Sequence, residues 1–296
     1  MNPRVEIIMP VRNPSDIMLE SIDSLIAQTR RSFAVLISDN HSSQGLEVIK
    51  KACHKLKSAK IPVRVVRPDQ ALGRVEHWNW AHSKAKADWL KPLFVGDILF
   101  PTYVKEILKR VAEKPKAKFI RCEQENRQAD ASVVTSRAPI SKMSLTPADF
   151  LHYYPRLGNW LGGPVNVAYH RLAWQLSGGY MPQLPVCADL QLYVTMILRH
   201  GLESIPIPLV AFQLHPQRFS HKIGKRRVNG FAEQWLILSQ LQNQCHSENL
   251  KLPPNIVLRT LWRLNFNHYR SRLSFFVKKL LGLENFRKQA TKQSSG

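Results

Sequence analysis

Residues 5–40 read VEIIMPVRNPSDIMLESIDSLIAQTRRSFAVLISDN, and this stretch decides the fold. Val5–Val11 and Ser32–Ser38 are short, mostly apolar runs of the kind found in strands buried inside a parallel sheet. Between them, apolar side chains recur at the spacing of an α-helix, at Leu19, Ile22, Leu25 and Ile26. The stretch therefore predicts a strand–helix–strand unit.

The same alternation continues to about residue 95. Further helices are predicted over Leu46–Lys57 and Val75–Ala87, and further strands over Val63–Val66 and Asp88–Val95. Strands that alternate with helices predict an α/β protein, with a parallel sheet and helices on both of its faces.

The rest of the chain is less regular. A strand is expected near Phe119–Glu123, a polar loop over Asn126–Ser144, a helix over Ala188–His200 and a strand over Ile205–Leu214. From about Phe231 the pattern is mostly helical. The length suits one large domain or two small ones.

Polar clusters follow three of the predicted strands. They are Arg12-Asn13 after the first strand, Asp39-Asn40 after the second and Asp97 after the fourth. In open α/β sheets, ligands bind beyond the carboxyl ends of the strands, so these clusters mark a candidate site. The alternative is that Asn and Asp simply form turns at these positions.

The composition excludes some classes of protein and leaves others open. The chain has 296 residues, of which 44% are hydrophobic, and this excludes disorder of the whole chain. It carries 43 Lys and Arg against 21 Asp and Glu, a net charge of +22. Residues 214–296 alone contain 15 basic and 3 acidic residues. Such a field attracts phosphate on nucleotides, nucleic acid or anionic lipid, without choosing among them.

The cysteines and the apolar runs indicate the compartment. The four cysteines are far apart, so neither a disulfide framework nor a zinc site is expected. We see no signal peptide at the start and no run of 18 apolar residues. We therefore expect a cytoplasmic protein, which the basic tail could place at the inner face of a membrane.

Several segments together resemble the family 2 glycosyltransferases, which have the GT-A fold. They are VEIIMPVRN from Val5, SLIAQT from Ser24, LISDNHSS from Leu36, KPLFVGDILFP from Lys91 and GGPVNVAYHRLAWQLSGGY from Gly162. Ala188-Asp189-Leu190 stands where the family's catalytic acid begins a helix. The resemblance spans about residues 4–225.

The resemblance implies a Rossmann-like, mostly parallel sheet flanked by helices, in a catalytic domain over residues 1–225. Its nucleotide-binding half would span about 1–100 and its acceptor half about 101–225, and residues 226–296 would form a basic helical extension. It also implies inverting transfer of a sugar, of hexosyltransferase type, from a nucleotide sugar, with UDP as the expected nucleotide.

This chain departs from the family at three places. The metal-binding turn usually carries two or three adjacent acids, but here Asp97 stands alone after Gly96. The catalytic acid commonly follows another acid, but here Ala188 precedes Asp189. An acid often found late in the second turn is replaced by Gln44.

The resemblance assigns a nucleotide site to the first strands. Pro10, Val11 and Asn13 would shape the pocket, and Asp39 would accept a hydrogen bond from the base. The alternative for Asp39 is an N-terminal cap of the following helix. Arg74 would contact the base or the diphosphate, or else be a solvated side chain.

The departing nucleotide develops negative charge, which Mg²⁺ or Mn²⁺ neutralises. These ions use few protein carboxylates and take phosphate oxygens and water as other ligands. Asp97 would therefore serve both as a metal ligand and in the nucleotide site, or else simply form a turn. His215 would be a second metal ligand, or else a histidine on the surface of a loop. The basic residues of the following loop would cover the phosphates as a lid or form a solvated face: Arg218, Lys222, Lys225, Arg226 and Arg227.

Inverting transfer needs one general base that deprotonates the acceptor hydroxyl. Asp189 is the candidate, with a helix cap as the alternative. Trp160, Gly162 and Gly163 would form the acceptor platform, since aromatic rings stack on sugars and glycines allow close approach. The alternative is that Trp160 is a core residue.

The basic tail mixes Leu, Trp and Phe with Arg and Lys over residues 256–281. Such a segment can lie on an anionic membrane, which would suit a lipid-linked or other glycan acceptor in polysaccharide assembly. The alternative is a helical pair packed on the catalytic domain. No nucleic-acid-binding motif is present. Two rival functions remain, a catalytically inactive relative that binds a glycan or partner, and a basic scaffold for lipid or nucleic acid.

Overall fold

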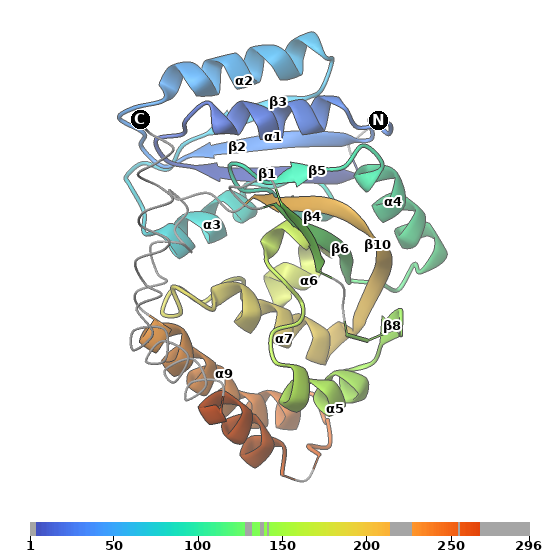
Figure 1. Ribbon diagram of the computed structural model, residues 1–296. Helices are drawn as coiled ribbons and strands as arrows, with labels where there is room; N and C mark the ends of the chain where they lie inside the picture. Colours follow the sequence, from blue (N-terminus) through green and yellow to red (C-terminus); the bar gives the residue numbers. More distant parts are fainter. Residues whose placement is uncertain are drawn as a thin grey trace.

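The computed structural model describes residues 4–127, 132–136, 139–140, 142–213, 227–253 and 255–266. Its centre is one mixed, twisted sheet, whose strands follow one another from β3 at the top of Figure 1 to β10 in the middle. The described strands are β1 (Val5–Val11), β2 (Phe33–Asp39), β3 (Val63–Val66), β4 (Trp89–Pro92), β5 (Ile98–Leu99), β6 (Phe119–Arg127), β7 (Val133–Ser136), β8 (Ser144–Leu145), β9 (Val167–His170) and β10 (Leu202–Gln213).

The sheet has the order β3-β2-β1-β4-β9-β6-β10-β5. The first four strands are all parallel, as the alternation of strands and helices predicts. Beyond them, β9 runs antiparallel to both β4 and β6, while β10 returns parallel to β6. The α/β architecture is confirmed, and the parallel arrangement belongs mainly to its N-terminal half.

Helices cover both faces of the sheet, as predicted. The described helices are α1 (Ile17–Ile26), α2 (Leu46–Ser58), α3 (Arg74–Ser83), α4 (Tyr103–Glu113), α5 (Pro147–Leu157), α6 (Arg171–Leu176), α7 (Ala188–His200) and α9 (Arg227–Ser247), with a 3₁₀ turn η1 (Pro164–Asn166). In β1, Ile7 and Met9 face the core under α1, α2 and α4, whereas Ile8 faces the core under α3, α5, α6, α7 and α9. This alternation follows from the two-residue period of a strand.

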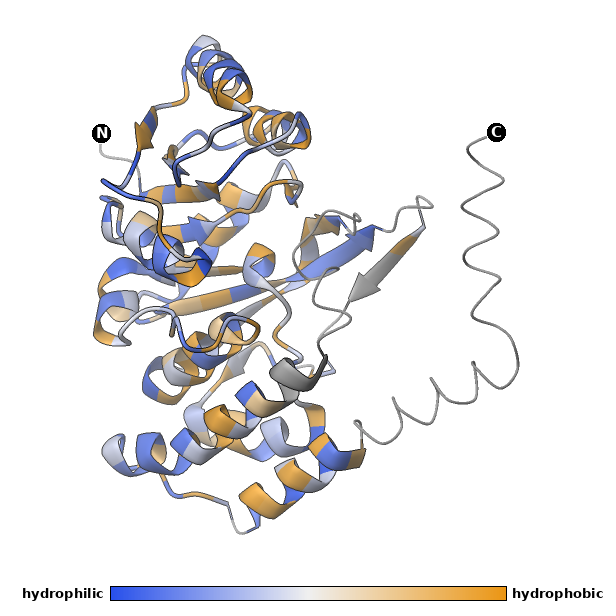
Figure 2. Cartoon of the chain, turned by 90° about the vertical axis from the view of Figure 1, so that its left-hand side faces the viewer, coloured by the Kyte–Doolittle hydropathy of each residue, from blue (hydrophilic) through white to orange (hydrophobic). Residues whose placement is uncertain are grey.

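The C-terminal helices pack on α7 and its neighbours in the core. Ile237, Leu241 and Cys245 of α9 are buried in the same core as α7. A last helix, residues 256–266, buries Ile256 and Leu264 on one side. Both helices form the lower end of the molecule in Figure 1. Figure 2 shows apolar residues interrupting the polar ones along them.

Some local expectations need correction. The predicted loop over Asn126–Ser144 contains β7, which pairs with β6 and is therefore formed by a tertiary contact. The third helix ends at Ser83, four residues before the predicted end. The amphipathic helix α4 was not predicted. Within the described residues, no helix has the length and apolar character needed to cross a membrane.

Candidate active site

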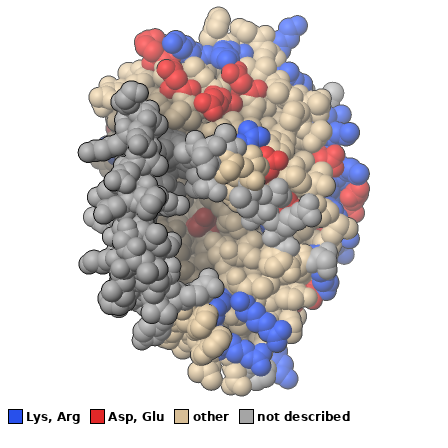
Figure 3. All heavy atoms as spheres, in the orientation of Figure 1, with Lys and Arg blue, Asp and Glu red and all other residues tan. Residues whose placement is uncertain are grey.

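A cavity of about 660 Å³ opens at the carboxyl ends of β1 and β4, beside the starts of α3 and α7. This volume lies in the usual range for small-molecule sites. Figure 3 shows a hollow in the middle of this face, with acidic atoms at its base. The cavity is lined by Pro10, Val11, Arg12, Asn13, Pro14, Ser15, Asn40, Leu72, Arg74, His77, Trp78, Phe94, Val95, Asp97, Gly163, Pro164, Pro185, Val186, Asp189 and Phe212.

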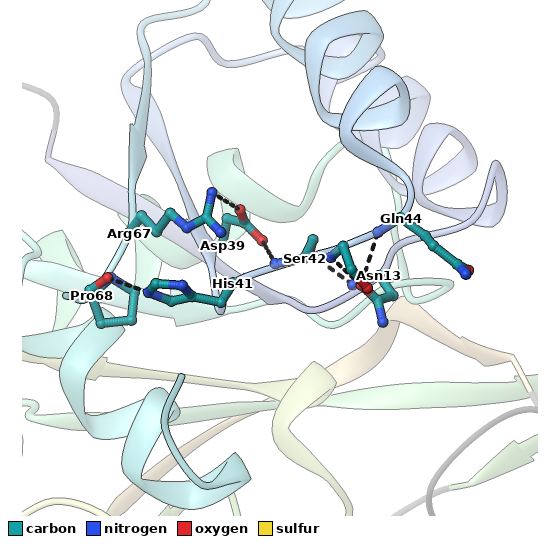
Figure 4. A network of polar contacts seen from close by, with 8 residues as sticks. Asn13, Asp39, His41, Ser42, Gln44, Arg67 and Pro68 are labelled. Carbon is teal, nitrogen blue, oxygen red and sulfur yellow. Dashed lines mark hydrogen bonds and ion pairs between the residues drawn. The ribbon is translucent and has the colours of Figure 1, made fainter. Parts of the chain in front are cut away.

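Asn13 connects the loops that follow β1 and β2 at one side of this cavity. It has a positive φ of 48°, and its backbone N–H donates to Ser42 Oγ at 2.8 Å. Its Oδ1 accepts hydrogen bonds from the N–H groups of Ser43 at 2.9 Å and Gln44 at 3.2 Å (Figure 4). The wall made by the end of β1 is therefore held in place before any ligand arrives.

Asp39 is one of the predicted site residues that do not line this cavity. It is 3% exposed and does not line the cavity, although its neighbour Asn40 does. Its Oδ1 accepts a hydrogen bond from Ser42 N at 3.0 Å, and its Oδ2 lies 3.8 Å from Arg67 Nη1 (Figure 4). These contacts match the turn alternative. Gly45, rather than Asp39, is the N-cap residue of α2.

Three side chains from the first turns of α3 line the cavity, and they are Arg74, His77 and Trp78. His77 was not singled out in the sequence, although its spacing from Arg74 and Trp78 places all three on one helix face. Its Nε2 lies 2.8 Å from Ser38 Oγ, and burial lowers the pKa of His77 to about 4. The ring is therefore neutral at neutral pH.

Arg74 is directed to the α7 side of the cavity. Its Nη2 donates a hydrogen bond to the carbonyl of Pro185, and its guanidinium lies 4.5 Å from the centre of the Trp78 ring. Burial lowers the pKa of Arg74 to about 10, while the charges of Asp189 and Glu233 oppose this shift. Arg74 therefore stays charged and contributes a cation beside Asp189.

Asp97 is 1% exposed and lines the cavity at the turn after β4. Gly96 precedes it with a φ of 89°, a conformation that favours glycine. The Gly96 N–H donates to Ser21 Oγ at 3.0 Å, which fixes this turn to α1. His215, the other predicted metal ligand, and the basic residues Arg218, Lys222, Lys225 and Arg226 lie outside the described residues.

Asp189 lines the same cavity from the first turn of α7. The N-cap residue of α7 is Cys187, so Asp189 is not the cap. Burial raises the pKa of Asp189 to about 6, and the charge of Glu233 adds to this, while the Leu190 N–H and Arg74 oppose it. A carboxylate with a pKa near the working pH is suited to accept a proton.

The three predicted acceptor residues are divided. Gly163 lines the cavity, but Trp160 and Gly162 do not. Trp160 is half-buried against the core, and the Arg121 guanidinium lies 5.6 Å from the centre of its ring. Gly162 has a φ of 85°, and a Cβ there would stand 2.4 Å from Asn166 Nδ2. The glycine is thus required by the backbone, and the ring has the contacts of a core residue.

Comparisons with known proteins show which family one segment resembles and which fold the chain has. Residues 6–120 match the model of glycosyl transferase family 2. No curated protein matches the sequence. S. aureus TarS 1–349 in complex with UDP-GlcNAc is 13% identical with a TM-score of 0.67, over 87% of this chain and 71% of that chain.

A second solved structure is similar over nearly the whole chain. The mannosyltransferase PcManGT from Pyrobaculum calidifontis, in complex with GDP-Man and Mn²⁺, is 17% identical with a TM-score of 0.57. The similarity covers 99% of this chain and 85% of that chain. At these identities the likeness shows the fold. The chain has the GT-A glycosyltransferase fold, and its segment 6–120 is similar to glycosyl transferase family 2.

Proposed function

We propose that the protein is an inverting glycosyltransferase that transfers a hexose from a nucleotide sugar to a hydroxyl group. The observation that carries the proposal is that Asp97, from the turn after β4, and Asp189, from the first turn of α7, line one cavity beside the end of β1. The match to family 2 over residues 6–120 supports it. We take UDP as the nucleotide and a glycan or lipid-linked sugar as the acceptor.

The reaction assigns a task to each side of the cavity. Pro10, Val11 and Asn13 form the wall against which the nucleotide binds, and Arg12 lies beside it to meet the diphosphate. Asp189 accepts the proton of the acceptor hydroxyl as its oxygen attacks the anomeric carbon. The bond from that carbon to the diphosphate breaks, and its electron pair leaves with the nucleotide.

A divalent cation would have Asp97 as its protein ligand. Within the described part of the chain, no group of three or more His, Cys, Asp or Glu side chains is arranged to hold a metal ion. Mg²⁺ can nevertheless be bound through one or two carboxylates together with substrate phosphates, so Asp97 fits this role once a donor is present. Bound there, the cation would neutralise charge on the departing phosphate.

This arrangement predicts that nucleotide and metal bind together. UDP with Mn²⁺ should raise the melting temperature by several degrees when UDP exceeds its Kd about 100-fold, because ligand binding stabilises the fold by about 2.7 kcal/mol under that condition. The measurement is a thermal-shift titration with UDP, GDP and a single-stranded oligonucleotide.

Asp97→Asn should remove the Mn²⁺-dependent part of this rise, and Asp69→Asn, an exposed acid outside the cavity, is the matched control. A rise with oligonucleotide alone would instead favour the basic scaffold. Binding of UDP without turnover of any nucleotide sugar would favour the catalytically inactive relative.

We also propose that the protein works at the inner, cytoplasmic face of a membrane, through its C-terminal helix. Leu258, Trp262 and Phe266 are spaced by one helical turn and are 66%, 68% and 51% exposed. The rings of Trp262 and Phe266 are stacked with centroids 5.4 Å apart. This places an apolar stripe on the outside of the molecule.

Charge complements the stripe and points to an anionic bilayer. Figure 3 shows Lys and Arg gathered at the end of the molecule formed by α5 and the C-terminal helices. Residues 255–266 contain no acid, and residues 267–296 carry seven Lys and Arg against one Glu. Aromatic residues beside basic ones are typical of helices that lie in the lipid headgroup region.

The protein should therefore co-sediment with vesicles of phosphatidylglycerol and phosphatidylcholine, and much less with phosphatidylcholine alone. Trp262→Ser with Phe266→Ser should weaken binding about tenfold or more, since each ring loses its burial in lipid. Leu176→Ser is the matched control, because Leu176 is 64% exposed on another helix. Equal binding by the double variant, or a concentration-dependent dimer that the double variant abolishes, would contradict the lipid assignment.

A further inference from the structure

The start of α7, which carries Asp189, is held by a carboxylate from outside the region that resembles the family. Glu233 lies on α9 and is 5% exposed. Its Oε2 accepts hydrogen bonds from the backbone N–H groups of Val186 at 2.8 Å and Cys187 at 2.7 Å. Bonds from two backbone amides to one buried carboxylate are charge-assisted and stronger than those between neutral groups.

This carboxylate takes the place of a side-chain cap. Cys187 is the N-cap residue of α7, and its own side chain makes no capping bond. Its thiol instead donates to the carbonyl of Gly230 on α9, at 3.6 Å. A negative charge before the first turn also interacts favourably with the helix dipole. The position of the first turn of α7, and with it Asp189, therefore depends on α9.

α9 packs closely against the loop that precedes α7 and against α7 itself. A Cβ added at Gly230 would lie 3.3 Å from Val186 Cγ1, so the backbone of α9 contacts the loop directly. Further along, Gln244 Nε2 on α9 donates to Thr195 Oγ1 on α7 at 3.0 Å. α9 is thus bound to α7 at two levels, and Val186 itself lines the cavity.

The charge of Glu233 also acts on Asp189. The titratable and charged groups around Asp189 come from α3, α9, α7 and the preceding loop, and they are Arg74, Glu233, Cys187, Tyr193 and Tyr180. Of these, Arg74 lowers the pKa of Asp189 and Glu233 raises it, in the same direction as burial. Cys187, Tyr193 and Tyr180 have pKa values raised by burial, so all three are neutral at neutral pH.

We propose that Glu233 is a positioning residue that holds the start of α7 and keeps Asp189 ready to accept a proton, which makes α9 part of the catalytic unit. This inference rests on the proposed function, in which Asp189 is the base. It assigns Glu233 no contact with substrate. Its effect on the reaction passes through the two amides and through its charge.

Two variants separate these effects. Glu233→Gln keeps a carbonyl oxygen for both amides but removes the charge, so the acid limb of kcat/KM should move to lower pH by roughly 0.3–1 unit. Glu233→Ala also leaves the N–H groups of Val186 and Cys187 without an acceptor. In this variant kcat should therefore fall about tenfold or more, while KM for the donor changes little. Glu233→Gln should retain most of the kcat that Glu233→Ala loses. Glu248→Gln is the matched control, since Glu248 pairs with Arg199 rather than with the start of α7.

The readouts keep this inference distinct from the proposed function. An NMR titration of the Asp189 carboxyl, assigned with Asp189→Asn, needs no substrate and should show the same downward shift in Glu233→Gln. The role of Glu233 would be overturned by two results together. In Glu233→Gln, the Asp189 carboxyl would titrate as in the unaltered protein and the acid limb of kcat/KM would not move. In Glu233→Ala, kcat would stay at its full value. Absence of any turnover by the unaltered protein, with the shift still seen by NMR, would instead overturn the proposed function.

Discussion

Asp189→Asn should lower the rate of sugar transfer by about 10²- to 10⁴-fold, the usual contribution of a general base. The amide keeps the size of the side chain and can still accept the Leu190 N–H bond, which Asp189 Oδ1 makes at 2.8 Å. It cannot take a proton from the acceptor. Because the nucleotide wall lies on β1, UDP affinity should stay within a few-fold of the unaltered protein. The measurement is kcat alongside calorimetric UDP binding.

The pH dependence of transfer follows from the same residue. Burial raises the pKa of Asp189 to about 6, and the base acts only when deprotonated. In the unaltered protein, kcat/KM should therefore fall about tenfold per pH unit below roughly pH 6. Transfer at the normal rate by Asp189→Asn, or a flat profile between pH 5 and 7, would show that another group takes the proton.

The melting temperature of Asp189→Asn shows whether a loss of activity could come from misfolding. The pKa of Asp189 is higher in the folded chain than the ordinary value of 3.8, so the folded state binds the proton more tightly than the unfolded state. The contribution of Asp189 to stability is therefore favourable at low pH and is lost as the pH rises through about 6. Asp189→Asn should consequently melt no lower than the unaltered protein at pH 8. A lower melting temperature would show that lost activity reflects misfolding.

The second large effect concerns a buried ion pair in the middle of the sheet. Arg121 and Glu123 are 2% and 6% exposed on β6, which lies between β9 and β10. Arg121 Nη1 and Nη2 donate to the two carboxylate oxygens of Glu123 at 3.2 and 3.4 Å. Glu123→Leu should lower the free energy of unfolding by about 3–5 kcal/mol, because it leaves the Arg121 charge buried without its partner.

A double-mutant cycle tests this assignment. Arg121→Met with Glu123→Leu removes both charges and should recover most of the lost stability, since apolar residues often replace a buried pair at little cost. Chemical denaturation of the four proteins gives the coupling energy. Simple additivity of the two single variants would show that the pair is not coupled.

The regular elements could be predicted because local patterns determine them. Val5–Val11 and Ala188–His200 have the predicted bounds, since each is a continuous or periodic apolar run ended by a turn residue. β7 was not predicted, because its four residues form a strand only by pairing with β6. α4 was not predicted, although its buried residues Tyr103, Val104, Ile107 and Leu108 recur at helical spacing.

The candidate site was only partly predictable, for a related reason. The rule that ligands bind beyond strand ends predicted Asn13 and Asp97 at the site, the family resemblance predicted Asp189, and all three line one cavity. The rule does not state which way a side chain turns, and Asp39 turns toward Arg67. Glu233 lies 46 residues from Cys187 in the sequence, and no local pattern relates the two. Such contacts follow from the packing of α9 on α7.

The most direct test of the proposed function is a screen of nucleotide sugars for release of free nucleotide by the purified protein. With Mn²⁺ present, the protein should turn over at least one donor, with UDP sugars first, and both Asp97→Asn and Asp189→Asn should lose this turnover. No release from any UDP or GDP sugar by the unaltered protein, or release that both variants retain, would contradict the claim that this cavity is a glycosyltransferase site.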